Sequence, residues 1–332
     1  MIRTVGLFLA AAVFFLNAGC TKRRESAPER IQASTSIIGD IVSRIAGERA
    51  DVNVLIGRGE NPHSWEPTPR DMAELEESRL LFMNGLGLEE GLVPVLDSLS
   101  GLTVIDLSQG MDILGEEHDI HGETEHSGEE DRHDHEEEHS EQTAEEHWHE
   151  TDPHLWLSPR NVIIWTHSIA EALAAADPDN GDAYREAAAG YREELALLDE
   201  EMAALMGSIP PERRKLLTGH SSMAYFARDY GLVVIDSIIP HTSDRAELSA
   251  RHLSRFEDMF ASEGIPAIFI EEGSPRAVMQ FAETLARQSR GGASVVILKT
   301  GALSKEGERG SDYIDFIRYN AEQIAHALKD GR

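Results

Sequence analysis

The sequence predicts an α/β protein of two lobes, each with a parallel sheet flanked by helices, joined by one long connecting helix. Three observations indicate this fold class. Short apolar strands alternate with amphipathic helices along both halves of the chain, as in parallel sheets covered on both faces. Between the halves, residues 182–206 keep a narrow apolar stripe that suits one helix roughly 35 Å long. The length of 332 residues also suggests about two domains.

In the N-terminal half, apolar runs predict four strands, at residues 31–36, 52–56, 80–83 and 102–105. After the first strand, a helix places its apolar side chains on one face: Ile37, Ile38, Ile41, Val42 and Ile45. Thr68 caps the next helix, with Pro69 at its first position and Asp71 three residues after the cap. A further helix is predicted near residues 88–98.

The middle of the chain predicts two successive helices. Ser158 and Pro159 open the first, and Asp177-Pro178 breaks it. The second has apolar residues spaced alternately by four and three: Tyr184, Ala188, Tyr191, Leu195, Leu198, Met202 and Leu205. Such a stripe also suits one half of a coiled-coil dimer. Because it spans only about three heptads, we interpret it as a connector lying along both lobes.

The C-terminal half repeats the alternation of strands and helices. Strands are predicted at residues 215–218, 232–236, 266–270 and 294–298, and helices at 222–230, 246–261, 274–288 and 313–328. The predicted organisation is therefore an N-terminal lobe at 31–177, a connecting helix at 178–207 and a C-terminal lobe at 208–332.

The N-terminus predicts export. Arg3 precedes an apolar run, 5–16, that is too short for a comfortable membrane span. The run closes on Asn17-Ala18-Gly19-Cys20, which resembles a bacterial lipoprotein box. Cys20 is the only cysteine, so an intrachain disulfide is excluded and lipid attachment is the favoured explanation; secretion without a lipid is the alternative. We expect a signal peptide at 1–20, a polar tether at 21–30, and a lipid-anchored protein on the periplasmic or outer cell surface, held by several acyl chains.

Residues 116–150 form a stretch of unusual composition. It holds eight histidines, sixteen acidic residues and one basic residue, Arg132. Almost no apolar side chain interrupts it, so we predict a disordered loop over 115–151. Its imidazoles are expected to collect metal ions: His118, His121, His126, His133, His135, His139, His147 and His149. The chain's net charge of −30 repels the phosphates of nucleic acid, so we expect no binding to DNA or RNA.

Three histidines outside this loop follow predicted strands. His63 follows the second strand, His220 the first strand of the second half, and His154 the insertion after the strand ending at Ile105. Binding crevices of open parallel sheets form at the carboxyl ends of strands, so the three should meet between the lobes. One histidine beside Pro or Gly is more often structural, but the three together with the His-rich loop predict a metal site. We interpret the other histidines as surface or structural: His167, His241, His252 and His326.

The segments around these histidines resemble a known family. Residues 61–69 (NPHSWEPTP), 152–159 (DPHLWLSP) and 218–226 (TGHSSMAYF) are similar to the zinc and manganese solute-binding lipoproteins of bacterial ABC importers, the cluster A-I group. The resemblance extends from Ile31 to Leu328. It implies two α/β lobes joined by one long helix, with His63, His154 and His220 as metal ligands. It also implies an ABC permease and its ATPase as partners.

The fourth ligand is where this sequence departs from the family. Members commonly carry an Asp in the loop after the last strand, and Gly301 stands at that position here. Water, or a carboxylate of Glu60, Glu271 or Glu272, is then expected to fill the place. For the pair Glu271–Glu272, the alternative is a structural hydrogen bond or salt bridge.

We predict from these features a monomeric extracytoplasmic receptor that delivers Zn²⁺ to a permease. Three neutral imidazoles favour Zn²⁺ over Mn²⁺, which prefers more oxygen ligands, and the His-rich loop resembles that of zinc importers. Manganese or iron as cargo is the alternative of the same type. From other classes, the alternatives are a zinc hydrolase, a surface adhesin and a metal buffer. No HExxH or Gly-x-Ser-x-Gly motif is present, so we expect no enzymatic activity.

Overall fold

The structure is a computed structural model that describes residues 29–96, 98–115, 151–239, 250–289 and 292–330. The predicted signal peptide, Cys20 and the eight histidines of residues 116–150 lie outside the described residues. Within the described ranges, no helix combines the length and the apolar character needed to cross a bilayer.

The N-terminal lobe is built on a parallel four-stranded sheet in the order β2-β1-β3-β4. Its strands are β1 (Glu29–Thr35), β2 (Ala50–Ile56), β3 (Leu80–Met83) and β4 (Thr103–Asp106). All four strands predicted for this half are present. Glu29 and Arg30 pair with Ala50 and Asp51, so the sheet takes in the last two residues of the stretch predicted as a tether.

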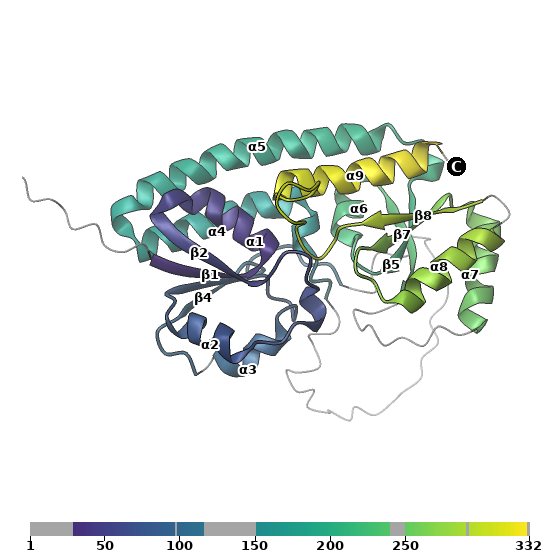
Figure 1. The fold of residues 1–332 in the computed structure, drawn as a ribbon. Coiled ribbons are helices and arrows are strands. Elements are labelled where there is room, and N and C mark those ends of the chain that lie inside the picture. The colour runs from purple at the N-terminus through teal and green to yellow at the C-terminus, as the bar shows by residue number, and fades with distance from the viewer. Residues whose placement is uncertain (1–28, 97, 116–150, 240–249, 290–291, 331–332) are drawn as a thin grey trace, which may run out of the picture.

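Helices cover both faces of this sheet (Figure 1). They are α1 (Ser36–Ala46), α2 (Pro69–Glu76), α3 (Val93–Leu96) and α4 (Pro159–Ala176). The predicted cap of α2 is a complete capping box, since Thr68 and Asp71 each accept from the other's backbone N–H.

The prediction of one helix near residues 88–98 is wrong in the extent of that helix. The segment holds a 3₁₀ turn, Glu90–Leu92, followed by the short α3. Pro94 lacks the N–H that would bond to the carbonyl of Glu90, so one continuous helix cannot form there.

The C-terminal lobe repeats the same arrangement. Its parallel sheet has the order β6-β5-β7-β8, with β5 (Lys215–His220), β6 (Val233–Ile239), β7 (Ala267–Glu271) and β8 (Ser294–Leu298). Its helices are α6 (Ala224–Tyr230), α7 (Ala250–Glu263), α8 (Arg276–Gln288) and α9 (Tyr313–Asp330). β5 is two residues longer than predicted, so His220 is the last residue of a strand and not part of a loop.

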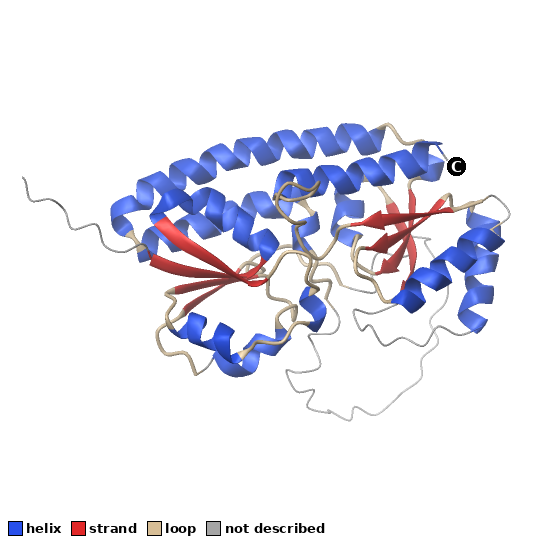
Figure 2. Cartoon of the chain, in the orientation of Figure 1, coloured by secondary structure: helices blue, strands red, loops and turns tan. Residues whose placement is uncertain are grey.

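A single helix, α5 (Gly181–Gly207), runs along both lobes, with α9 beside it (Figures 1 and 2). It packs against α1, α4 and α9 of the same chain. Its apolar stripe is buried in these contacts: Tyr184, Ala188, Tyr191, Leu195, Leu198 and Met202. The stripe is therefore used within the chain, as a connector, and one continuous apolar core joins α5 to both sheets.

Candidate metal centre

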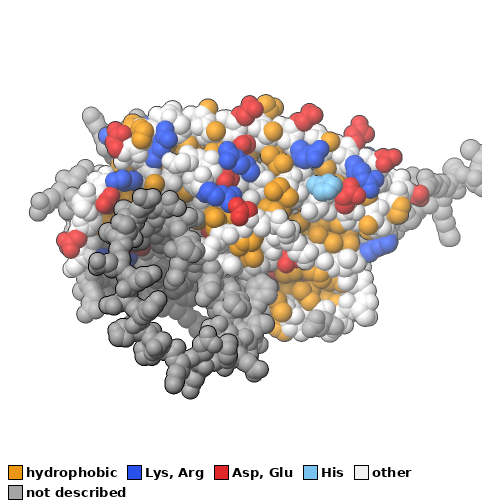
Figure 3. Space-filling view, turned by 180° about the vertical axis from the view of Figure 1, so that it is seen from behind, with side chains coloured by type: hydrophobic (Ala, Val, Ile, Leu, Met, Phe, Trp, Pro, Cys, Tyr) orange, Lys and Arg blue, Asp and Glu red, His pale blue; other side chains and the backbone are white. Residues whose placement is uncertain are grey.

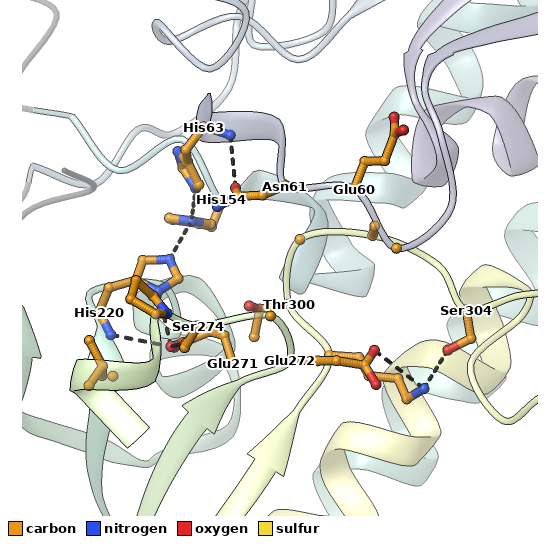
Figure 4. Close-up of a pocket in the computed structure, with 18 of the residues that line it drawn as sticks. Glu60, Asn61, His63, His154, His220, Glu271, Glu272, Ser274, Thr300 and Ser304 are labelled. Atoms are coloured by element: carbon orange, nitrogen blue, oxygen red, sulfur yellow. Dashed lines mark hydrogen bonds and ion pairs between the residues drawn. The ribbon is translucent and has the colours of Figure 1, made fainter. Parts of the chain in front are cut away.

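The three predicted histidines meet at one point between the lobes (Figure 4). The Nε2 atoms of His63 and His154 lie 3.0 Å apart, and those of His154 and His220 lie 3.3 Å apart. One nitrogen from each ring falls within 4.8 Å of the other two. Two of the rings come from the N-terminal lobe and one from the C-terminal lobe, so the cluster is formed only when both lobes are in place.

His63 is held by a tight turn after β2. It is the second residue of a 3₁₀ turn, Pro62–Ser64, and the side chain of Asn61 caps that turn by accepting from the His63 backbone N–H at 3.0 Å. Pro62 fixes the backbone at the first position of the turn. The Asn-Pro-His sequence thus sets the direction of the imidazole locally.

His154 is buried, with 1% of its surface exposed, and Asp152 holds it from two sides. Asp152 Oδ1 accepts from the backbone N–H of His154 at 2.8 Å and lies 2.7 Å from its ring Nδ1. Because the carboxylate can only accept from the ring, His154 Nδ1 carries the proton and Nε2 carries the lone pair. The ring therefore presents a free donor atom to the other two histidines.

The loop around His154 is fastened to both lobes by residues that the sequence did not single out. Directly after β3, the Asn84 side chain donates to the carbonyl of Pro153 at 2.9 Å. From α6, the Tyr225 hydroxyl donates to the carbonyl of Asp152 at 3.0 Å and accepts from the backbone N–H of Leu114. These are single polar residues in apolar surroundings, and only their tertiary position gives them this role.

His220 is held by Glu271, which ends the neighbouring strand β7. Glu271 Oε2 lies 3.2 Å from His220 Nδ1 and also accepts from Ser274 Oγ at 3.3 Å. This close approach depends on Gly219, because a Cβ there would lie 2.3 Å from the same carboxylate oxygen. The structural hydrogen bond considered for Glu271 is thus present.

The two carboxylates create an unfavourable contact that a cation relieves. Asp152 and Glu271 take the Nδ1–H groups of His154 and His220, so both Nε2 atoms present lone pairs to each other at 3.3 Å. Two such acceptors cannot share a hydrogen bond unless one is protonated. A metal ion bound to both removes the repulsion, and carboxylate-supported imidazoles of this kind are typical of metal sites.

The electrostatics of the cluster also disfavour protons on the rings. Burial lowers the pKa of His154 well below its usual value, and the neighbouring His220 lowers it further. Burial likewise lowers the pKa of His63, with added effects of His154 and His220. Burial raises the pKa of Asp152 to about 7. Burial acts to raise the pKa of Glu271, but the His220 imidazole and hydrogen bonds outweigh it and leave that pKa lowered.

The spacing of the ring nitrogens fits a single small cation. Two imidazoles bound to one tetrahedral zinc at about 2.0–2.1 Å place their nitrogens roughly 3.3 Å apart. Two of the observed separations, 3.0 and 3.3 Å, lie near this value, and the third is at most 4.8 Å. The cluster could therefore hold a metal ion of this size without rearrangement of the backbone.

Each carboxylate considered as a fourth ligand has another partner. Glu60 turns away from the imidazoles and accepts from the backbone N–H of Gly57 at 2.7 Å (Figure 4). Glu272 lies 3.6 Å from Lys299 Nζ. Glu271 is occupied by His220. Within the described part of the chain, the close group of potential ligand atoms contains the three imidazoles and no carboxylate.

A cavity of about 410 Å³ opens beside the imidazoles. Gly301 lies in its wall, where the chain passes the ring of Pro62. Three convergent imidazoles thus lie beside a cavity between two α/β lobes, and comparison with known proteins identifies the family that has this arrangement.

Residues 31–327 match the family described as zinc-uptake complex component A, periplasmic (ZnuA). The chain belongs to this family. The alignments with its relatives, which are substrate-binding lipoproteins of metal ABC transporters, extend over almost the full length of both chains. The chain is 27% identical over 333 residues to the manganese ABC transporter substrate-binding lipoprotein PsaA of Streptococcus pneumoniae, and 26% identical over 332 residues to the metal ABC transporter substrate-binding lipoprotein FimA of Streptococcus parasanguinis. In both comparisons, 97% of each chain is covered.

Solved structures of similar proteins share the two-lobe architecture. The periplasmic zinc-binding protein TroA of Treponema pallidum superposes with a TM-score of 0.72, at 25% identity, covering 91% of this chain and 99% of TroA. A manganese-bound periplasmic metal-binding protein of Candidatus Liberibacter asiaticus gives a TM-score of 0.70 at 25% identity, over 90% of this chain and 99% of its own. The predicted family resemblance and fold class are thus confirmed.

Proposed function

We propose that this ZnuA-family protein is an extracytoplasmic receptor that binds one Zn²⁺ through His63, His154 and His220 and delivers it to an ABC permease with its ATPase. The observation that carries the proposal is the cluster itself. Rings from both lobes point their Nε2 atoms at one another, and buried or half-buried carboxylates hold two of them as lone-pair donors. A metal cation can accept all three lone pairs, whereas protonation of the rings is disfavoured by their burial.

The donor set favours zinc over manganese. All the converging atoms are imidazole nitrogens, and these suit Zn²⁺ better than Mn²⁺, for which oxygen ligands are preferred. Relatives named for manganese make manganese the alternative of the same type, with iron beside it. A competition titration in which Mn²⁺ displaces Zn²⁺ at equal concentration would contradict the choice of zinc.

A zinc hydrolase needs a general base, and the described carboxylates that contact the imidazoles are not placed for that role. A catalytic zinc also has three protein ligands and one open position, so the ligand set alone does not decide. Here, however, the nearest carboxylates, Asp152 and Glu271, bond to the Nδ1 side of the rings, on the far side from a metal at Nε2. We expect the zinc-loaded protein to show no turnover of ester, peptide or phosphate substrates.

Several features of the cellular role belong to the same proposal. Lipid on Cys20 anchors the protein to the membrane, and residues 116–150 bind several ions weakly as an accessory collector. The chain acts as a monomer, since the apolar stripe of α5 is used internally.

On the face drawn in Figure 3, Lys and Arg side chains are interspersed with Asp and Glu, which does not favour nucleic acid binding. A surface role in adhesion would be an addition to metal binding.

Release of the ion is expected to need only small movements. The lobes share one apolar core along α5, and direct hydrogen bonds cross between them. Arg58 donates to the carbonyls of Ser304 and Ser311, at 2.8 and 2.5 Å, and Trp156 Nε1 donates to the carbonyl of Thr300 at 2.6 Å. A wide hinge would break these bonds together, so we propose loop shifts or a slight tilt instead.

A zinc titration of two soluble proteins tests the proposal. One is the chain from Thr21, and the other is the same chain with residues 116–150 removed. Gly115 and Thr151 already form an antiparallel bridge, so a short turn can join them without disturbing the lobes. We expect one tight site in both proteins and additional weak sites only in the intact one.

Substitutions separate the cluster from the loop. His220→Ala should weaken the tight site by roughly 10²–10³-fold in both proteins. His167→Ala, which removes an exposed histidine of α4, should leave it unchanged. Loss of the tight site on deletion of 116–150 would show instead that the loop holds the ion, and the protein would then be a metal buffer.

A further inference from the structure

The cavity beside the three imidazoles is much larger than a metal ion needs. Its volume of about 410 Å³ compares with roughly 30 Å³ for one water molecule. The three histidines form one end of it, and the backbone of Thr300, Gly301 and Ala302 forms part of the wall. A tetrahedral ion held by three rings would keep one position free, and the cavity that these three rings line would offer room for a ligand there.

Gly301 is a wall residue whose backbone conformation does not require glycine. Its φ is not in the left-handed region, so a side chain is allowed there. A Cβ at this position would meet only the Pro62 ring, at 3.2 Å to Cδ and 3.8 Å to Cγ. A small shift of the ring would accommodate it. The glycine therefore leaves space in the wall beside His63 that another residue would occupy.

The charges around the cluster favour an uncharged occupant. Asp152 and Glu271 together balance a divalent ion bound to three neutral imidazoles. The rest of the cavity wall carries three carboxylates and two ammonium groups, on Glu60, Glu272, Glu308, Lys299 and Lys305. An anion entering the cavity would thus add negative charge beside an ion whose charge is already balanced and to a wall that carries a small excess of negative charge.

We propose that the cavity admits a small neutral nitrogen donor of the imidazole class as the exchangeable fourth ligand of the bound metal. This inference rests on the proposed function, because it needs the metal on His63, His154 and His220. Water fills the position when no such donor is present. An ion with one exchangeable ligand can accept an incoming donor before it leaves its histidines, which eases transfer from a rigid receptor.

The test uses cobalt as a spectroscopic stand-in for zinc. The protein with residues 116–150 removed is loaded with one Co²⁺, and its visible absorption is followed while imidazole or azide is added. We expect imidazole to change the spectrum saturably with a stoichiometry of one. Azide, a smaller nitrogen donor that carries a negative charge, should bind at least about tenfold more weakly, a difference of 1.4 kcal/mol.

Two matched substitutions locate the donor. Gly301→Asp places a carboxylate in the cavity wall next to Pro62 and should suppress the imidazole response while Co²⁺ still binds. Gly101→Asp adds the same group at an exposed position before the amino end of β4, and should leave the response as in the parent. An undiminished response in Gly301→Asp would place the imidazole outside the cavity and overturn the inference.

The outcomes also separate this inference from the proposed function. If the parent protein binds no Co²⁺ or Zn²⁺ tightly, the proposed function itself fails. If it binds Co²⁺ tightly but the spectrum ignores imidazole, or responds equally to azide, the receptor function stands and the neutral-donor cavity is wrong.

Discussion

The two lobes have the same strand order but supply the metal site in different ways. The sheets have the orders β2-β1-β3-β4 and β6-β5-β7-β8. In each, the strand that comes first in the sequence, β1 or β5, takes the second position in the sheet. The N-terminal lobe offers His63 and His154 on turns outside its strands, whereas the C-terminal lobe offers His220 as the last residue of β5. His154 is 1% exposed, while the His220 side chain is 19% exposed.

The difference shows two ways to fix an imidazole. A ring on a turn has no sheet register to fix it, so it needs several separate contacts. Around His154, Asp152 supplies a local one, and Asn84 and Tyr225 supply two from distant parts of the chain. A ring at a strand end is fixed by the register of the sheet, and one acceptor from the next strand, Glu271, completes it. We therefore expect the N-terminal half of the site to be the more rigid one, and the following experiments test that contrast.

Removing a ligand from either lobe gives the largest expected effect. A zinc site of four ligands is worth about 10–16 kcal/mol, so loss of one ligand should weaken binding by roughly 10²–10³-fold. We expect this for both His154→Ala and His220→Ala in a competition titration.

The two variants should differ in stability. His154→Ala leaves the buried Asp152 without its ring partner, which costs about 1–3 kcal/mol in the free energy of unfolding. His220→Ala, at a more exposed position, should change that free energy less. Denaturant unfolding of the metal-free proteins measures this, and equal losses would contradict the contrast between the lobes.

Neutralising the supporting carboxylates should have the next largest effect. Groups that orient metal-bound histidines commonly change metal affinity by about 10–100-fold. Asp152→Asn should lie at the upper end of this range, because Asp152 bonds to the backbone and ring of His154 at 2.8 and 2.7 Å, whereas Glu271 contacts the same groups of His220 at 3.5 and 3.2 Å. Glu271→Gln should lie at the lower end. The reverse order in zinc affinity would show that the C-terminal half is the more demanding one.

Zinc affinity should fall in two stages as the pH decreases. Burial raises the pKa of Asp152 to about 7, so the metal-free protein takes up a proton there below that pH and zinc must expel it. The pKa values of His63 and His154 are lowered, so competition from ring protons begins only below their usual value near 6.5.

A matched variant separates the two stages. Asp152→Asn removes the first proton and should flatten the affinity profile between pH 8 and about 6.5, while the decline at lower pH remains. Dissociation constants measured across this range check the shape. A wild-type profile that is flat down to pH 5 would contradict a site made of histidines.

Neutralising the carboxylates that do not contact the imidazoles should have the smallest effect on zinc affinity. Glu60→Gln and Glu272→Gln each remove a charge from the cavity wall but no group bonded to an imidazole. We expect changes in zinc affinity below about threefold, the scale of exposed charge interactions. A loss of tenfold or more in either variant would identify that residue as the fourth ligand after all.

The sequence alone determined the alternation of strands and helices, the connector and the three histidines. Periodicity reports which face of an element is buried, so the stripe of α5 and the strands of both sheets could be predicted. Asn61-Pro62 and Asp152-Pro153 also act within a few residues of His63 and His154, and such local constraints are written in the chain itself.

Only the tertiary structure decided which residues support the histidines and where the carboxylates considered as a fourth ligand lie. Glu271 reaches His220 because β7 lies beside β5 in the sheet, 51 residues away along the chain. Asn84 and Tyr225 meet the His154 loop from opposite lobes, and Gly301 meets Pro62 across the cleft. These contacts depend on strand order and on the packing of two lobes against one helix, and residue spacing in the sequence carries no information about such distances.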